Sequence, residues 1–135
     1  MNDLRPSAVS AGFLLDTVGT WLTVLAIIPF TPGLAGLSED QQTAFLTAAP
    51  AVQVLGALWT VVGGFFAAHL APEREIPNAF AVGALSSMIG FLSAFSAPST
   101  VPFAYEAVGL AITIPLALVG GWLRVKLPRR GGPAR

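Results

Sequence analysis

The chain has 135 residues, of which 54% are hydrophobic and 10% are charged, and its formal net charge at pH 7 is zero. An ordinary soluble domain has about 25% charged residues, so this composition excludes the usual soluble surface. The balanced charge excludes an overall basic field for nucleic acid, and the lack of cysteine excludes disulfides and thiolate metal sites. The length suits a single domain over residues 1–135.

Four apolar segments each have the length of about 20 residues that a membrane-spanning helix needs. They cover residues 8–30, 51–70, 78–96 and 103–123. Prolines stand at or beside their ends, where a helix tolerates the missing N–H or stops. These prolines are Pro6, Pro50, Pro77 and Pro102 near the starts and Pro29, Pro32, Pro72 and Pro98 near the ends. The predicted fold class is therefore all-α, an integral membrane bundle of four antiparallel helices.

The segment between the first two spans predicts one further short helix, over residues 39–48. Ser38 followed by Gln41 has the pattern of a capping box at a helix start. Two placements of this helix are open. It either lies at the outer interface of the membrane or extends the second span, and Pro50 would then kink the longer helix.

The basic residues predict the direction of insertion. If the N-terminus is cytoplasmic, all 7 Lys and Arg residues fall in inside segments and none falls in an outside loop. This is the distribution that the positive-inside rule describes. We therefore expect a multi-pass protein of the bacterial inner (plasma) membrane with both termini in the cytoplasm.

Small residues at four-residue spacing predict close helix packing. Membrane helices associate where small side chains let the backbones approach, because lipid tails are as apolar as leucine. Gly56 and Gly64 lie on one face of the second span, and Gly83 and Gly90 belong to two such rows on the third. These rows either pack the bundle itself or serve a homo-oligomer or a larger membrane complex, with the lipid bilayer as the surrounding partner.

Asp16 is a carboxylate inside the first apolar segment. At about 1.5 Å per helical residue it lies roughly 12 Å from the inner end, beside Thr17 and at a similar depth to Thr60, Ser86 and Ser87. An ionised carboxylate at a helix centre in the membrane costs about 2.5–3.5 kcal/mol on insertion scales. Two alternatives follow for Asp16. It is either a neutral structural acid bonded by Ser or Thr hydroxyls, or a water-accessible carboxylate that exchanges a proton or cation.

The run LLDTVGTWL, residues 14–22, resembles the first helix of the small multidrug resistance transporters, where an acidic residue is followed by a Gly-Thr pair. The resemblance implies a four-helix membrane fold in which Asp16 is the shared proton and substrate carboxylate. This chain has Asp where that family has Glu. Its one-sided charge distribution also dictates a single direction of insertion, whereas some members of the family insert in both directions.

A second run, GGFFAAHLAPEREIPNAFAVGAL, covers residues 63–85. It is similar to a helix–loop–helix segment of uncharacterised small bacterial four-helix membrane proteins. That resemblance implies the same architecture and carries no function with it.

No nucleophile with a base, phosphate loop or metal-ligand cluster occurs in the sequence, so we predict no enzyme activity, catalytic residue, metal site or cofactor. The leading prediction is a structural or accessory subunit of a membrane complex. The alternative is a small proton-coupled transporter that uses Asp16 as its proton or cation site. A transporter requires a cavity that reaches Asp16 from one side, whereas a scaffold predicts a dry, hydroxyl-bonded carboxyl group.

Overall fold

The computed structural model describes residues 4–96 and 103–127, without the side chains of residues 35, 47, 48, 94–96 and 103–106. This part of the chain is helical and contains no strand. Its helices are α1 (Pro6–Ile27), α2 (Glu39–Ala48), α3 (Pro50–Leu70), α4 (Glu75–Ser96) and α5 (Phe103–Lys126), with short 3-10 helices at Ile28–Phe30 and Leu34–Gly36. Four of the helices, α1, α3, α4 and α5, are long and apolar enough to cross a membrane, which confirms that prediction.

The helix ends differ from the predicted ones by a few residues. α4 begins at Glu75, three residues before the predicted start, so that Pro77 lies inside its first turn. Proline is tolerated there because the first four N–H groups of a helix have no partner within it. α5 continues to Lys126 rather than ending at residue 123, and its last turn carries Arg124 and Lys126.

α2 is a separate helix and does not extend α3. The predicted capping box is present: Ser38 Oγ accepts from the Gln41 backbone N–H at 3.4 Å, and the Ser38 N–H donates to Gln41 Oε1 at 3.1 Å. Ala49 is extended, as a residue before proline prefers to be, and this breaks the helix before Pro50. The depth of α2 relative to a membrane stays a prediction.

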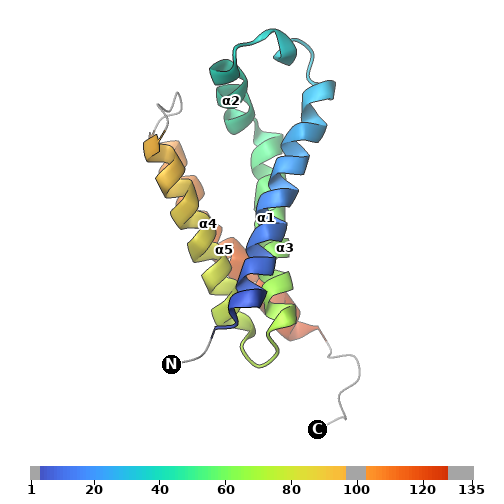
Figure 1. The fold of residues 1–135 in the computed structure, drawn as a ribbon, viewed down its shortest axis with the longest axis vertical. Coiled ribbons are helices and arrows are strands. Elements are labelled where there is room, and N and C mark those ends of the chain that lie inside the picture. The colour runs from blue at the N-terminus through green and yellow to red at the C-terminus, as the bar shows by residue number, and fades with distance from the viewer. Residues whose placement is uncertain (1–3, 97–102, 128–135) are drawn as a thin grey trace.

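The four long helices converge at one end and spread apart at the other (Figure 1). α1 lies beside α3, and α5 contacts both α3 and α4. The helices form a V, with α1 and α3 in one arm and α4 in the other, and α2 lies at the end where the arms separate. We call the converging end the basic end, because Arg5, Arg74, Arg124 and Lys126 lie at the helix ends that meet there. The opposite end is the α2 end.

The tightest packing is backbone against backbone at glycines in the basic half of the bundle. A Cβ placed on Gly12 would lie 2.6 Å from the carbonyl oxygen of Gly63, so α1 and α3 touch there directly. A Cβ on Gly120 of α5 would collide with the carbonyl of Val61 on α3. Contacts this short exist only where a side chain is absent, which explains why glycine occupies these positions.

The four glycines predicted to pack helices make different contacts. Gly64 faces the backbone of α5 at Ala117, and Gly83 faces the α5 backbone near Ile114. Gly90 meets only the end of the Leu110 side chain, and a Cβ on Gly56 would find one methyl group at 3.9 Å. Gly64 and Gly83 therefore hold helices together, whereas Gly56 and Gly90 lie where the bundle opens.

Hydrogen bonds between helix ends close the basic end. Asn78 is fully buried. Its Oδ1 accepts from the Arg5 backbone N–H at 2.8 Å, and its Nδ2 donates to the Arg74 carbonyl at 2.7 Å. On the other side, Arg124 Nε donates to His69 Nδ1 at 3.0 Å. The start of α1, the α3–α4 turn and the end of α5 are thereby joined.

Large apolar side chains point outward along the long helices. On α1, Leu14, Val18, Leu22 and Leu25 are each more than half exposed. Such a surface in water would be an aggregation hazard, whereas lipid solvates it at no cost. The outward face therefore agrees with the reading of these helices as membrane spans.

Replacing Gly120 by Ala should destabilise the bundle, because the new Cβ overlaps the Val61 carbonyl. We expect a loss of about 1–3 kcal/mol in the free energy of unfolding, as for other overpacked sites. Gly109→Ala is the matched control on the same helix, since a Cβ there meets nothing within 4 Å. Unfolding in mixed micelles measures both, and equal stabilities of the two variants would contradict the backbone contact.

Candidate functional site

Asp16 accepts a hydrogen bond from each of two neighbouring helices. Asp16 lies on α1, and the residue is only 6% exposed. Thr60 Oγ1 of α3 donates to one carboxylate oxygen, Oδ1, at 3.0 Å. Ser86 Oγ of α4 donates to the other, Oδ2, at 2.7 Å. One carboxyl group thus links three helices through side chains far apart in the sequence.

The glycines beside Asp16 make this arrangement possible. A Cβ on Gly63, one turn along α3 from Thr60, would lie 3.0 Å from the Cβ of Asp16. Because Gly63 has no side chain, α1 approaches α3 closely enough for a short aspartate to reach the threonine hydroxyl. The Gly12–Gly63 contact lies one turn further toward the basic end.

The other two hydroxyls predicted at this level do not reach the carboxylate. Ser87 Oγ turns to α5 and donates to the Leu110 carbonyl at 3.2 Å. That carbonyl precedes Ala111, whose helical partner is missing because Pro115 has no N–H. Hydroxyls commonly satisfy backbone groups near such prolines in membrane helices. Thr17 is half-buried and makes no hydrogen bond to Asp16 in the described structure.

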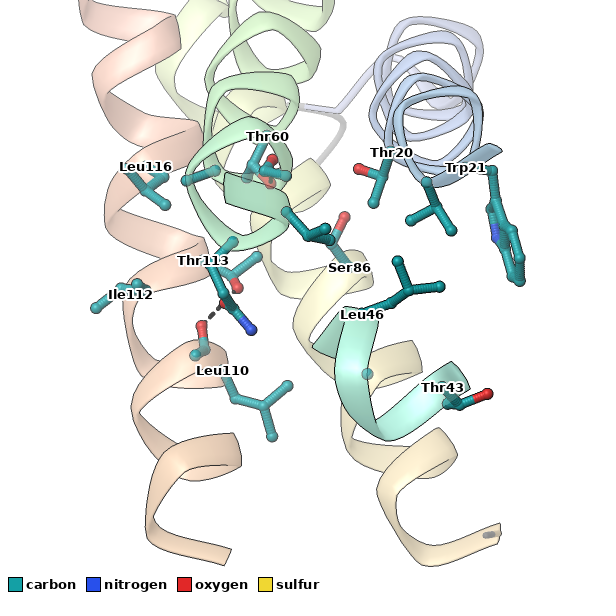
Figure 2. Close-up of a pocket in the computed structure, with 17 residues that line it drawn as sticks. Thr20, Trp21, Thr43, Leu46, Thr60, Ser86, Leu110, Ile112, Thr113 and Leu116 are labelled. Atoms are coloured by element: carbon teal, nitrogen blue, oxygen red, sulfur yellow. Dashed lines mark hydrogen bonds between the residues drawn. The ribbon is translucent and has the colours of Figure 1, made fainter. Parts of the chain in front are cut away.

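A pocket of about 500 Å³ lies on the α2 side of Asp16. Figure 2 shows side chains from all five α-helices around it, including Trp21 of α1, Leu46 of α2 and Ile112 of α5. Its volume falls within the range of about 300–1,000 Å³ typical of small-molecule sites. Thr60 and Ser86 line the pocket, whereas Asp16 does not. The Thr60 and Ser86 hydroxyls therefore lie between the pocket and the carboxylate that they bond.

The lining is apolar with scattered hydroxyls. Its polar side chains are the hydroxyls of Thr20, Thr43, Thr60, Ser86 and Thr113, the amide of Gln53 and the indole of Trp21. The described part of the chain contributes no Asp, Glu, His, Lys or Arg to the lining. Asp16, when it is ionised, places a formal charge one hydrogen bond behind this wall, through Thr60 and Ser86.

The pocket ends where the tight packing begins. Apart from Gly19 and Leu34, the buried residues of the described chain lie level with Asp16 or between it and the basic end. Beneath the carboxylate the backbones of α1 and α3 touch at Gly12 and Gly63, and Val82 of α4 is fully buried beside them. The site is thus closed by backbone packing toward the basic end, and α2 lines it at the other end through Thr43 and Leu46.

Trp59 fastens α1 to α3 on the pocket side of Asp16. Its Nε1 donates to Thr23 Oγ1 at 2.9 Å, and its ring covers Gly19, where any side chain would collide with it. This satisfies the indole N–H, which needs a partner when it is buried. Trp59 is therefore part of the framework, whereas Trp21, 64% exposed, borders the pocket.

Several parts of this site lie outside what sequence reasoning identified. The roles of Gly12 and Gly63 in seating Asp16 were missed, although their spacing from Asp16 and Thr60, one turn each, was a usable signal. The pocket itself has no sequence signal, because it depends on the angle between helices. Within residues 4–96 and 103–127, no group of three His, Cys, Asp or Glu side chains could hold a metal ion.

Comparisons with known proteins add no relative: no protein-family model matches the chain, and neither a curated protein nor a solved structure matches it significantly.

The hydrogen bond between Asp16 and Ser86 should appear as an energetic coupling in a double-mutant cycle. We expect Asp16→Ala and Ser86→Ala to couple by about 0.6–1.7 kcal/mol, from the average to the maximum found for hydrogen bonds between membrane helices. Ser87→Ala is the matched control, since it removes a neighbouring hydroxyl that bonds α5 instead. Its coupling to Asp16 should stay below about 0.5 kcal/mol. Reversible unfolding measures both cycles, and equal couplings would refute the assigned partners.

Proposed function

We propose that this protein is a small proton-coupled transporter of the bacterial inner membrane, with Asp16 as its proton site. The observation that carries the proposal is that Thr60 and Ser86 both bond Asp16 and line the pocket. A solute in the pocket and a proton on the carboxylate would then act on the same two hydroxyls. Intramembrane carboxylates are commonly parts of ion and proton pathways, which supports the same assignment.

The pocket is the reason to prefer transport over a purely structural role. A carboxylate that only fixed helix register would be satisfied by its two hydroxyls and would need no 500 Å³ space beside them. That volume suits a small molecule, and the backbone packing below Asp16 closes the bundle toward the basic end, as one gate of a carrier must. The structural or accessory subunit, alone or in a homo-oligomer, is the second candidate. Asp16 is 6% exposed, is bonded by two hydroxyls and does not line the pocket, which is what a scaffold carboxyl group requires.

The basic residues support an orientation for this transporter. Arg5, Arg74, Arg124 and Lys126 belong to the same end of the bundle. By the positive-inside rule this end faces the cytoplasm, together with both termini. The pocket would then open toward the outside of the cell, and the closed end would be the inner gate.

Cysteine labelling tests this orientation cleanly, because the native chain contains no cysteine. Gly36→Cys lies in the α1–α2 connection and Pro72→Cys in the α3–α4 turn, and both positions are exposed. We expect a membrane-impermeant maleimide to label Gly36→Cys in intact cells and Pro72→Cys only after permeabilisation. The reverse pattern, or labelling of both positions in intact cells, would overturn the orientation.

Transport is tested in liposomes that hold the purified protein and a pH-sensitive dye. A panel of small amines, polyols and amino acids is added outside, and protein-free liposomes give the background. We expect at least one solute to move protons in the wild type and in Asp40→Asn, which removes an exposed carboxylate of α2. Asp16→Asn should reduce this flux at least tenfold. Proton movement unaffected by Asp16→Asn, or absent with every solute, would refute the proposal.

A further inference from the structure

The hydroxyl hydrogens at the pocket wall are already used inside the protein. A serine or threonine hydroxyl has one hydrogen to donate and two lone pairs that accept. Ser86 gives its hydrogen to Asp16 Oδ2 at 2.7 Å. Thr60 has two internal acceptors, Asp16 Oδ1 at 3.0 Å and the Gly56 carbonyl at 3.2 Å. Thr113 donates to the Gly109 carbonyl at 2.9 Å.

These three hydroxyls therefore offer only lone pairs to a molecule in the pocket. All three line it, on α3, α4 and α5, as Figure 2 shows for Thr60, Ser86 and Thr113. A ligand that brings its own N–H groups can bond to them without disturbing the bonds they already make. A ligand that only accepts hydrogen bonds would find no hydrogen on these groups.

The charge around the pocket selects further among donors. With Asp16 ionised, a negative charge stands one hydrogen bond behind Thr60 and Ser86, in surroundings of low dielectric constant where charges interact strongly. Among the described residues that line the pocket, none is a cation that would oppose it. The nearest basic residue of α5 in sequence, Arg124, is bonded to His69 at the basic end. A positively charged donor is therefore favoured over a neutral one.

Other parts of the lining, on α1 and α5, are suited to an apolar body. Trp21, Ile112 and Leu116 border the same space, and the Trp21 indole is 64% exposed. An aromatic face attracts cations as well as apolar groups. The pocket thus has a hydrogen-bond-accepting floor and an apolar side.

We propose that the pocket binds a small protonated primary amine with a compact apolar body, whose ammonium N–H groups donate to the hydroxyl oxygens of Thr60 and Ser86. The ammonium contacts the hydroxyls, and Asp16 acts through them from behind the wall. This assignment deepens the proposed function, on which it rests for the step from binding to transport.

The hydrogen bonds of Thr60 and Ser86 also couple amine binding to protonation of Asp16. When Asp16 takes up a proton, its own O–H must donate to one of the two hydroxyls that face it. If that hydroxyl is Ser86, its hydrogen turns toward the pocket, whereas the Thr60 hydrogen can turn to the Gly56 carbonyl. In both cases the floor loses its negative charge and one free lone pair. The ammonium is released as one proton is bound. The groups that face the carboxylate from α3 and α4 are Thr60, Ser86 and the backbone at Gly63, none of which titrates.

The test compares three probes that share one apolar body: benzylammonium, benzyltrimethylammonium and benzyl alcohol. Titration calorimetry on the full chain in nanodiscs, with empty nanodiscs subtracted, gives each affinity. We expect benzylammonium to bind at least tenfold more tightly than the quaternary ion, which keeps the charge but has no N–H. Benzyl alcohol, which donates without charge, should also bind more weakly than benzylammonium.

Two variants separate this reading from general attraction to a cation. In Asp16→Asn the carboxylate charge is lost and the amide N–H donates to one hydroxyl, which occupies a lone pair that the ammonium would use. The preference for benzylammonium over the quaternary ion should therefore fall below threefold. Ser87→Ala, whose hydroxyl bonds α5 and does not line the pocket, should keep the full preference. Circular dichroism and the affinity for benzyl alcohol, which Asp16→Asn should retain, show that each variant is folded.

The outcomes distinguish the ligand from the transport proposal. Equal binding of the ammonium and quaternary probes, or no saturable binding of benzylammonium, overturns the ligand assignment whatever the liposomes show. Selective binding without proton flux supports the ligand and refutes transport. Flux with solutes other than amines, without selective binding of benzylammonium, refutes the ligand and leaves transport standing.

Discussion

A carboxylate between apolar helices must take its hydrogen bonds from those helices, and this constraint organises the structure around Asp16. Thr60 and Ser86 each donate to one of its oxygens, so α1, α3 and α4 are tied together at one level. The short aspartate reaches α3 only because Gly63 carries no side chain. The close approach of α1 to α3 therefore also provides the carboxyl group with its hydrogen bonds. The close packing extends from Asp16 to the basic end.

The bundle has two halves of different character on either side of this level. Toward the basic end, glycine backbones touch and Asn78 joins the start of α1 to the α3–α4 turn. Toward the α2 end the helices diverge and leave a pocket, where Gly109 faces open space and Gly56 meets only one methyl group. Thr60 and Ser86 bond the carboxylate and also line the pocket, so protonation of Asp16 changes the hydrogen bonds that these hydroxyls can offer to a ligand. This is the physical basis on which binding and proton exchange are coupled in our proposal.

Counting depth along the helices identified the level of the site but not its members. Four hydroxyls were predicted beside Asp16, and the structure brings two of them to it. Successive residues point about 100° apart around a helix, so Ser86 faces α1 while Ser87 faces α5. Which of the two meets the carboxylate depends on how α4 is rotated in the bundle. That rotation is set by contacts such as Gly83 against the α5 backbone, and these join residues distant in the sequence.

The sequence by itself determined the four long apolar helices, the capped start of α2 at Ser38 and the placement of Asp16 within the first span, because hydropathy, proline positions and capping are local properties. The tertiary structure alone decided which hydroxyls bond Asp16, which glycines touch backbone and that a pocket opens above Thr60 and Ser86. Those features depend on the rotation and the spread of whole helices. Both follow from the combined packing of all four long helices, which no single segment encodes.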